Sequence, residues 1–140
     1  MSKKKLPKHF YILNPGTYPV TAVFAPNERA YRRALKRYSI NKDLDDGTYP
    51  SSAGRVTRYS SDERSNGNNA VLIVTIDLSL DVSEQQLAAL VAHECVHVMQ
   101  YIFSEIGEDR PGWEVEAYAV QSLVQDILCS IKHYRKELAS

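Results

Sequence analysis

The first quarter of the chain alternates short apolar runs with turn-forming and polar residues. Residues 9–26, HFYILNPGTYPVTAVFAP, predict two short strands on either side of a turn at Pro15-Gly16. Residues 27–40 have the three-to-four residue spacing of an amphipathic helix, with Asn27 in the N-cap position. The inner side of this helix is predicted to carry Ala30, Ala34, Leu35 and Tyr38.

The middle of the chain predicts a long loop and then two more strands. Residues 41–54 are rich in Asp, Ser, Gly and Pro, which favour turns, so they are expected to form a loop. Residues 55–60 and 69–78 are rich in β-branched residues and predict strands, joined by a polar connection. The second strand is nearly continuous in apolar residues, so we expect it inside a sheet or packed on both faces.

Two helices are predicted to close the chain. Ser83 and Gln86 form a capping box ahead of an apolar helix that Gly107 ends. Pro111 stands at the start of the next helix, predicted over 113–138. Its apolar stripe consists of Val120, Val124, Ile127, Leu128 and Ile131. The order β-β-α-β-β-α-α predicts an α+β fold with a small antiparallel or mixed sheet.

Length and composition are those of one globular domain. A chain of 140 residues with 44% hydrophobic and 24% charged residues can bury its own core. Residues 1–8 are basic and predict a flexible arm, so the domain is expected over 9–140. The formal net charge is zero, with 17 Lys and Arg against 17 Asp and Glu, and by itself favours neither a nucleic acid nor a membrane as partner.

The cysteines and the apolar segments indicate a cytoplasmic protein, or one released without a secretory signal. Cys95 and Cys129 have no pairing motif, which favours a reducing compartment, and both are predicted to be small core residues. No apolar segment follows the basic start as it would in a secretory signal. No apolar run approaches the roughly 20 residues that span a bilayer, so no membrane association is expected.

The segment HECVH, residues 93–97, is where the sequence points to chemistry. Side chains four residues apart share one side of a helix, so His93 and His97 can direct two imidazoles at one point. Neutral imidazole is a good zinc ligand. Glu94 is rotated about 100° from His93, beside such a metal, where a carboxylate can take a proton from a metal-activated water. This pattern predicts a catalytic zinc site.

A third ligand is expected from the following helix. Catalytic zinc usually has three protein ligands and one open position. Glu114 is the preferred candidate, because Ala117, Tyr118 and Gln121 share its helix face and Ala117 beneath it would let the two helices approach closely. Glu116 is the alternative. His133 lies too far along the same helix to join Glu114 at one metal.

These residues resemble the zincin metallopeptidases of the gluzincin type. Those enzymes join H-E-x-x-H on one helix to a glutamate on a following helix, and here H93-E94-C95-V96-H97 matches in full while E114-V115-E116-A117 is similar to the E-x-x-A form. The resemblance covers about residues 70–125. It implies zinc held by His93, His97 and Glu114, Glu94 as general base, and hydrolysis of a protein or peptide substrate.

The resemblance also implies where substrate and oxyanion would lie. The strand before the first of the two helices, VLIVTIDL, would form the sheet edge along which the substrate backbone pairs. Tyr118 and Tyr101 are candidates to stabilise the oxyanion, by helix position only. The short gap between the two motifs implies a minimal enzyme with an open cleft.

A second class of function stays open from the sequence. Arg29, Arg32, Arg33, Lys36 and Arg37 form a basic stripe on the helix predicted over 27–40. With the N-terminal lysines, this stripe could contact a nucleic acid or an acidic protein, although a solvated helix face gives the same pattern. The alternative function is therefore a non-proteolytic, zincin-like binding module with structural zinc that uses the basic helix.

Overall fold

The computed structural model of the chain describes residues 4–64 and 68–140. The elements are, in chain order, β1 (Tyr11–Ile12), β2 (Val20–Ala25), α1 (Glu28–Arg37), β3 (Gly54–Tyr59), α2 (Ser61–Arg64), β4 (Ala70–Ile76), α3 (Glu84–Ile106) and α4 (Trp113–Ala139). The predicted order of strands and helices is confirmed, and α2 is a one-turn addition in the connection between β3 and β4. This is the expected α+β class.

The four strands form one mixed sheet in the order β1-β2-β4-β3. β2 and β4 pair in parallel, while β1 and β3 each pair antiparallel with their inner neighbour. A parallel pair needs a crossover, and α1 with the long loop and β3 supplies it. The mixed form of the sheet agrees with the prediction.

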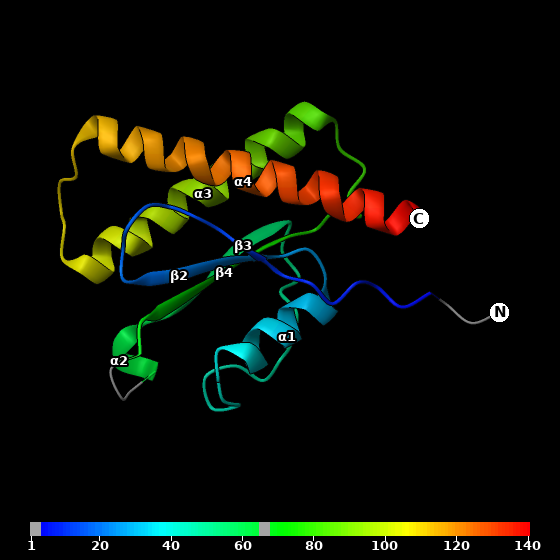
Figure 1. The fold of residues 1–140 in the computed structure, drawn as a ribbon, viewed down its shortest axis with the longest axis horizontal. Coiled ribbons are helices and arrows are strands. Elements are labelled where there is room, and N and C mark those ends of the chain that lie inside the picture. The colour runs from blue at the N-terminus through cyan, green and yellow to red at the C-terminus, as the bar shows by residue number, and fades with distance from the viewer. Residues whose placement is uncertain (1–3, 65–67) are drawn as a thin grey trace.

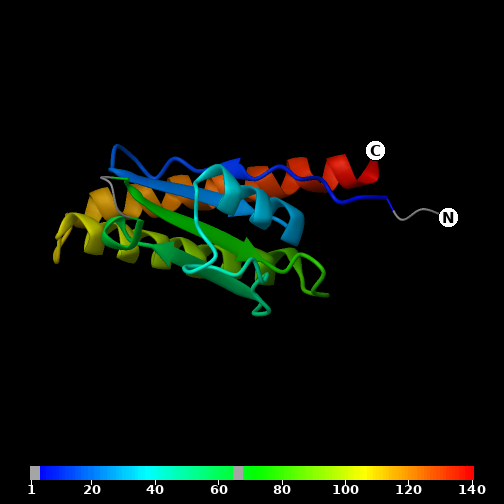
Figure 2. The ribbon, with the colours of Figure 1, turned by 90° about the horizontal axis from the view of Figure 1, so that it is seen from below.

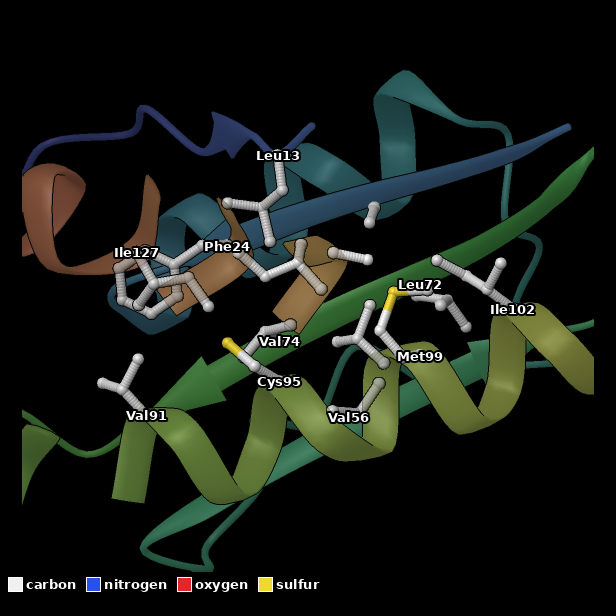
Figure 3. Packing of buried hydrophobic residues seen from close by; sticks show 14 of the residues in the cluster. Leu13, Phe24, Val56, Leu72, Val74, Val91, Cys95, Met99, Ile102 and Ile127 are labelled. Carbon is white, nitrogen blue, oxygen red and sulfur yellow. The ribbon is translucent and has the colours of Figure 1, made fainter. Parts of the chain in front are cut away.

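Helices cover both faces of the sheet, so the molecule has three layers. Figure 1 shows α1 on one side of the sheet and α3 with α4 on the other, and Figure 2 gives the same arrangement from below. Two apolar clusters fill the spaces between the layers. The larger one, seen in Figure 3, packs side chains such as Phe24, Leu72 and Val74 of the sheet against Cys95, Met99 and Ile102 of α3.

The ends of the helices follow the signals in the sequence. Asn27 Oδ1 accepts a hydrogen bond from the Ala30 amide at 2.8 Å and begins α1. Ser83 and Gln86 form both bonds of the predicted capping box at the start of α3. Gly107 ends α3 with φ of 73°, a left-handed conformation that glycine adopts without a steric cost. Ser83 and Gly107 thus set where the helix that carries the HECVH segment begins and ends.

The assignment of VLIVTIDL as the edge of the sheet is wrong. β4 lies between β2 and β3, and all of its seven residues are buried. Continuous apolar character is the pattern of a strand covered on both faces. The prediction from that pattern, a strand inside the sheet, is therefore confirmed. The edges are β1 and β3.

The described part of the N-terminal segment, residues 4–8, lies against the domain. Arg29 Nη1 donates to the Leu6 carbonyl at 2.8 Å, and Asn27 Nδ2 donates to the Pro7 carbonyl at 2.9 Å. Lys4 Nζ contacts the main-chain oxygen of Ser140. The segment therefore has contacts with α1 and with the end of α4.

By length and composition, α3 could cross a membrane, contrary to the expectation that no segment would. A helix buried in the core of a globular protein passes the same test. One side of α3, including Val91, Cys95 and Val98, is buried against the sheet.

Candidate metal centre

His93 and His97 lie together on the side of α3 that faces away from the core. His93 is exposed and His97 is partly exposed, while Cys95 between them is buried. The Nε2 atoms of the two imidazoles are 3.1 Å apart. Two nitrogen ligands at about 2.0–2.1 Å from a tetrahedral zinc ion lie roughly 3.3 Å apart, so this spacing fits a shared metal.

Gln100 orients one of the two imidazoles. Its Oε1 is 2.8 Å from His97 Nδ1, three residues earlier on the same helix. An amide oxygen can only accept, so Nδ1 carries the proton and Nε2, the nitrogen nearest His93, keeps its lone pair. Sequence reasoning missed Gln100, although its i, i+3 spacing from His97 was a usable signal.

Glu94 is buried, with 4% of its surface exposed. Burial raises the pKa of its carboxyl above the usual value, and the electrostatic influence of the neighbouring His93 and His97 partly offsets that rise. A buried carboxyl beside two imidazoles is placed to accept a proton from a group bound between them.

Gly54 at the start of β3 makes the space for this carboxyl. A Cβ at position 54 would lie 2.9 Å from Glu94 Oε1, 3.1 Å from Glu94 Cγ and 3.1 Å from Leu90 Cδ1. Such distances are too short for a relaxed contact, so a side chain at this position would displace the Glu94 carboxyl or the Leu90 side chain. No sequence signal identified Gly54, because the contact joins positions forty residues apart.

The free edge of β3 passes beside Glu94. The Asp77 amide donates to the Ala53 carbonyl at 2.8 Å, and the β3–β4 register continues from there. Because bonded and non-bonded pairs alternate in an antiparallel ladder, the main-chain groups of Gly54, Val56 and Arg58 point away from β4. The Gly54 carbonyl accepts from Ser52 Oγ at 3.1 Å. Among the described residues, no such partner is found for the main chain of Val56 or Arg58.

Glu114 is not brought to the histidines. Arg135 Nη1 is 3.0 Å from Glu84 Oε1, so α4 runs back along α3 in the opposite direction. Counting along the two helices from that ion pair, Glu114 lies about 18 Å beyond the level of His93 and about 12 Å beyond that of His97. As the third zinc ligand it stays a prediction that this arrangement does not support.

The helix face that carries Glu114 is also turned to solvent. Its members Glu114, Ala117, Tyr118 and Gln121 are all exposed, so the expected close approach of the helices at Ala117 is wrong. Tyr118 lines a separate hollow with the turn between β1 and β2, and is not beside the histidines. The residues of α4 that pack inward are instead Ala119, Leu123, Ile127, Ile131 and Tyr134.

The sequence offers three other candidate side chains for the site. Glu116 lies on the inner side of the first turn of α4 and is partly buried, but it is also near the far end of α3. Tyr101 lies two turns beyond Glu94 on α3, beneath the Arg58 guanidinium. His133 is exposed, and its Nδ1 is 3.0 Å from Tyr11 Oη, away from the HECVH segment as predicted.

The cysteines divide between the core and the surface. Cys95 is buried in the apolar cluster, as predicted, and burial raises the pKa of its thiol to about 12. Cys129 is exposed, so its assignment to the core is wrong. On α4 it stands outside the buried stripe.

The site thus brings together two imidazoles and a buried carboxyl, whereas catalytic zinc usually has three protein ligands. Within residues 4–64 and 68–140, no group of three or more His, Cys, Asp or Glu side chains that could hold a metal ion is found. The spacing of the histidine pair fits a metal, and a third ligand from α4 stays a prediction.

Comparison of the chain with protein-family models, with curated proteins and with solved structures gives no match. Membership of the zincin family therefore stays a prediction based on HECVH and its surroundings.

Proposed function

We propose that this protein is a zinc-dependent metallopeptidase in which His93 and His97 hold the metal and Glu94 is the general base. The observation that carries the proposal is the 3.1 Å separation of the two Nε2 atoms directly beside a buried carboxyl. A histidine pair in the core or on the surface does not need an acid in that position. A structural zinc site does not need one either, because Glu94 is not a ligand.

Each side chain of the site has a separate role in this proposal. His93 and His97 present neutral nitrogens, and Gln100 keeps the second one in the required tautomer. Zinc bound there would lower the pKa of a bound water to about 7. Glu94 would take the proton from that water, and its low exposure keeps competing solvent away from the carboxyl.

The peptide substrate would add to the free edge of β3. An extended peptide pairs with an unoccupied strand edge through its main chain, and Val56 and Arg58 offer main-chain groups for this. Gly54 at the start of the strand is next to Glu94, so a peptide on this edge would pass the base. The edge is thus β3, in place of the strand that the family resemblance implied.

Substitution of Glu94 separates the base from the ligands. Glu94→Gln is expected to retain zinc, because the side chain is beside the metal, and to lower the rate of hydrolysis by roughly 10²–10⁴. His97→Ala is expected to lose zinc and activity together. Zinc is measured by elemental analysis after dialysis, and hydrolysis by counting new amino termini in a mixed peptide library.

His133→Ala is the matched control, since this exposed histidine lies on α4 outside the site. It should retain both zinc and activity. Full hydrolysis by Glu94→Gln would refute the role of the base, and zinc retained by the His93→Ala, His97→Ala double variant would refute the metal site.

The third ligand can be tested separately. In the described arrangement, Glu114→Gln should leave the zinc affinity within about twofold, because the carboxylate does not reach the metal. A loss of 10-fold or more, which is typical when a ligand or its support is removed, would mean that the start of α4 moves towards α3 when zinc binds. Glu116→Gln measured in parallel decides between the two acids.

A further inference from the structure

The zero net charge of the chain conceals a strong separation of charge. Residues 1–42 contain ten Lys and Arg and a single Glu, a formal charge of +9. Residues 43–140 contain seven Lys and Arg against sixteen Asp and Glu, a formal charge of −9. Because α1 lies across the sheet from α3 and α4 (Figures 1 and 2), the basic residues of α1 are on the opposite face of the sheet from these two helices. Asp43, Asp45 and Asp46 of the acidic part lie in the loop next to α1.

The exposed side of α1 is entirely charged and almost entirely basic. Its apolar side, with Ala30, Tyr31, Ala34 and Leu35, is buried against the sheet. The exposed positions are Glu28, Arg29, Arg32, Arg33, Lys36 and Arg37. The basic members extend over about 12 Å of helix. The single acid, Glu28, is paired with Arg32 at 2.5 Å and so does not neutralise the rest.

The N-terminal segment extends this surface. Hydrogen bonds from Arg29 to the Leu6 carbonyl and from Asn27 to the Pro7 carbonyl hold the segment beside the first turn of α1. The exposed lysines at 4, 5 and 8 thereby continue the arginine stripe. We call the combined surface the basic face; it consists of Lys4, Lys5, Lys8, Arg29, Arg32, Arg33, Lys36 and Arg37.

Five side chains of the basic face form neither a hydrogen bond nor an ion pair among the described residues. Lys4, Arg29 and Arg32 have polar contacts within the protein. In the part of the chain that the structure describes, none of the remaining five, Lys5, Lys8, Arg33, Lys36 and Arg37, forms an ion pair. The loop with Asp43, Asp45 and Asp46 borders the face where Arg32 Nε contacts the Gly47 carbonyl, and marks its limit.

The composition of the basic face favours phosphate over other acidic partners. Protein interfaces usually have an apolar or aromatic centre, and the exposed side of α1 has no apolar residue. Helices that lie on membranes insert an apolar side, whereas the apolar side of α1 is buried. Four of the five cations on α1 are arginines, whose planar guanidinium matches phosphate oxygens in pairs.

We propose that the basic face binds the phosphodiester backbone of a double-stranded nucleic acid, without reading its sequence. Positive charge arranged along a helix and an adjoining segment is the usual electrostatic footprint of such binding. The acidic residues of the helical layer would orient the molecule by repulsion, with α3, the helix of the histidine pair, on the other face of the sheet (Figure 1). The inference is independent of the proposed hydrolytic activity.

Binding is measured by fluorescence anisotropy with a labelled duplex DNA of mixed sequence, about 20 base pairs long, over a series of KCl concentrations. Five released counterions predict a slope of log K against log [KCl] of about −4 to −5. Arg33→Glu with Lys36→Glu should weaken binding at least about tenfold in 50 mM KCl and make the slope shallower by about 2.

The matched control is Arg110→Glu with Lys132→Glu, which makes the same charge change at exposed positions of the helical layer. This variant should bind DNA like the wild type, and so should Glu94→Gln, which separates binding from hydrolysis. Arg33→Gln with Lys36→Gln, checked by its thermal unfolding, gives a milder variant with an intermediate loss. Duplex RNA of equal length should bind with comparable affinity, because the face reads charge.

Several results would overturn the proposal. These are an equal loss of DNA binding in the control variant, no salt-dependent binding in 50 mM KCl, and poly-glutamate that competes as well as unlabelled DNA. The last result would identify an acidic protein as the partner. Salt-sensitive self-association in light scattering, removed by Arg33→Glu with Lys36→Glu, would show that the basic face instead meets the acidic side of another copy.

Discussion

At the scale of single residues, the arrangement of Glu94 is the least ordinary feature of the molecule. A carboxyl that is removed from water favours its neutral form, and this explains the raised pKa. The carboxyl lies where the main chain of β3 comes close, and a Cβ at position 54 would be 2.9 Å from Glu94 Oε1. Gly54 is therefore a positioning residue for Glu94 in the proposed site.

Gly54→Ala tests that relation. The added methyl would lie 2.9 Å from Glu94 Oε1, so the carboxyl or the strand must move. The expected result is a decrease of about 1–3 kcal/mol in the free energy of unfolding, as for other overpacked sites, together with slower hydrolysis. Chemical denaturation followed by circular dichroism gives the first quantity.

Gly112→Ala is the control for this substitution, because a Cβ there would meet only Val115 Cγ2, at an ordinary 3.7 Å. It should change stability by no more than a few tenths of a kcal/mol in either direction. The cost of Gly54→Ala should also decrease in a Glu94→Ala background. An equal cost in both backgrounds would show that Glu94 is not what the new methyl meets.

At the scale of elements, α3 is attached to the edge strand by a polar contact as well as by packing. Glu105 Oε1 accepts from Arg58 Nε at 2.9 Å and from Arg58 Nη2 at 2.6 Å, and Glu105 Oε2 accepts from Ser61 Oγ at 3.2 Å. The Glu105 side chain is only 8% exposed. The Arg58 guanidinium also lies 5.4 Å from the centre of the Tyr101 ring. This contact anchors the far end of the strand that begins beside Glu94.

Arg58→Met should release that end. The substitution leaves the buried Glu105 carboxylate without its cation, and we expect unfolding to become easier by about 1–3 kcal/mol. Arg55→Met is the comparison on the same strand, because Arg55 is exposed and forms no ion pair among the described residues. Denaturant midpoints of the two variants measure the difference. Equal midpoints would mean that Arg58 and Glu105 do not stabilise the attachment.

At the scale of the whole molecule, the two helical layers, α1 on one face and α3 with α4 on the other, pack against the same sheet. Val23 and Ile73 face α1, whereas Phe24 and Val74 face α3 and α4, so each inner strand belongs to both cores. The α1 side also contains a polar group that joins three parts of the chain. Tyr31 of α1 and Tyr59 of β3 both donate hydrogen bonds to Asp45 of the long loop.

The tyrosine group predicts a loss of stability at alkaline pH. Burial and, next, the hydrogen bond to Asp45 raise the pKa of Tyr31 from 10.0 to about 12, and burial also raises the pKa of Tyr59. Between pH 10 and 12 the folded protein therefore holds protons that the unfolded chain has released. The free energy of unfolding should fall as pH rises through this range.

Denaturant unfolding at steps of pH between 9 and 12 tests the prediction. Tyr31→Phe should reduce the slope of stability against pH, because one of the displaced ionisations is removed. Asp45→Asn should let tyrosine ionise at lower pH in absorbance titration of the folded protein. A free energy of unfolding that does not change over this range would contradict the arrangement of the group.

The sequence by itself determined the local elements and half of the candidate site. Caps such as Asn27, Ser83 and Gly107 act on their own helices, so their effect is readable without the fold. The spacing of His93 and His97 is likewise a property of one helix, which is why their meeting could be predicted. The positions of distant segments relative to HECVH are not a local property. The predicted edge strand was therefore wrong, and the third ligand stays a prediction.

Only the tertiary structure decided which parts of the chain meet. The continuous apolar pattern of β4 could not show that β3 would become the edge strand, and no pattern paired Gly54 with Glu94. The face chosen for Glu114 was turned to solvent because the packing of α4 depends on its whole apolar stripe, whose register against α3 is set by long-range contacts. The distribution of charge over the surface also depends on the fold. A net charge of zero is a sum over the sequence, whereas the basic face results from the contact of the N-terminal segment with the first turn of α1.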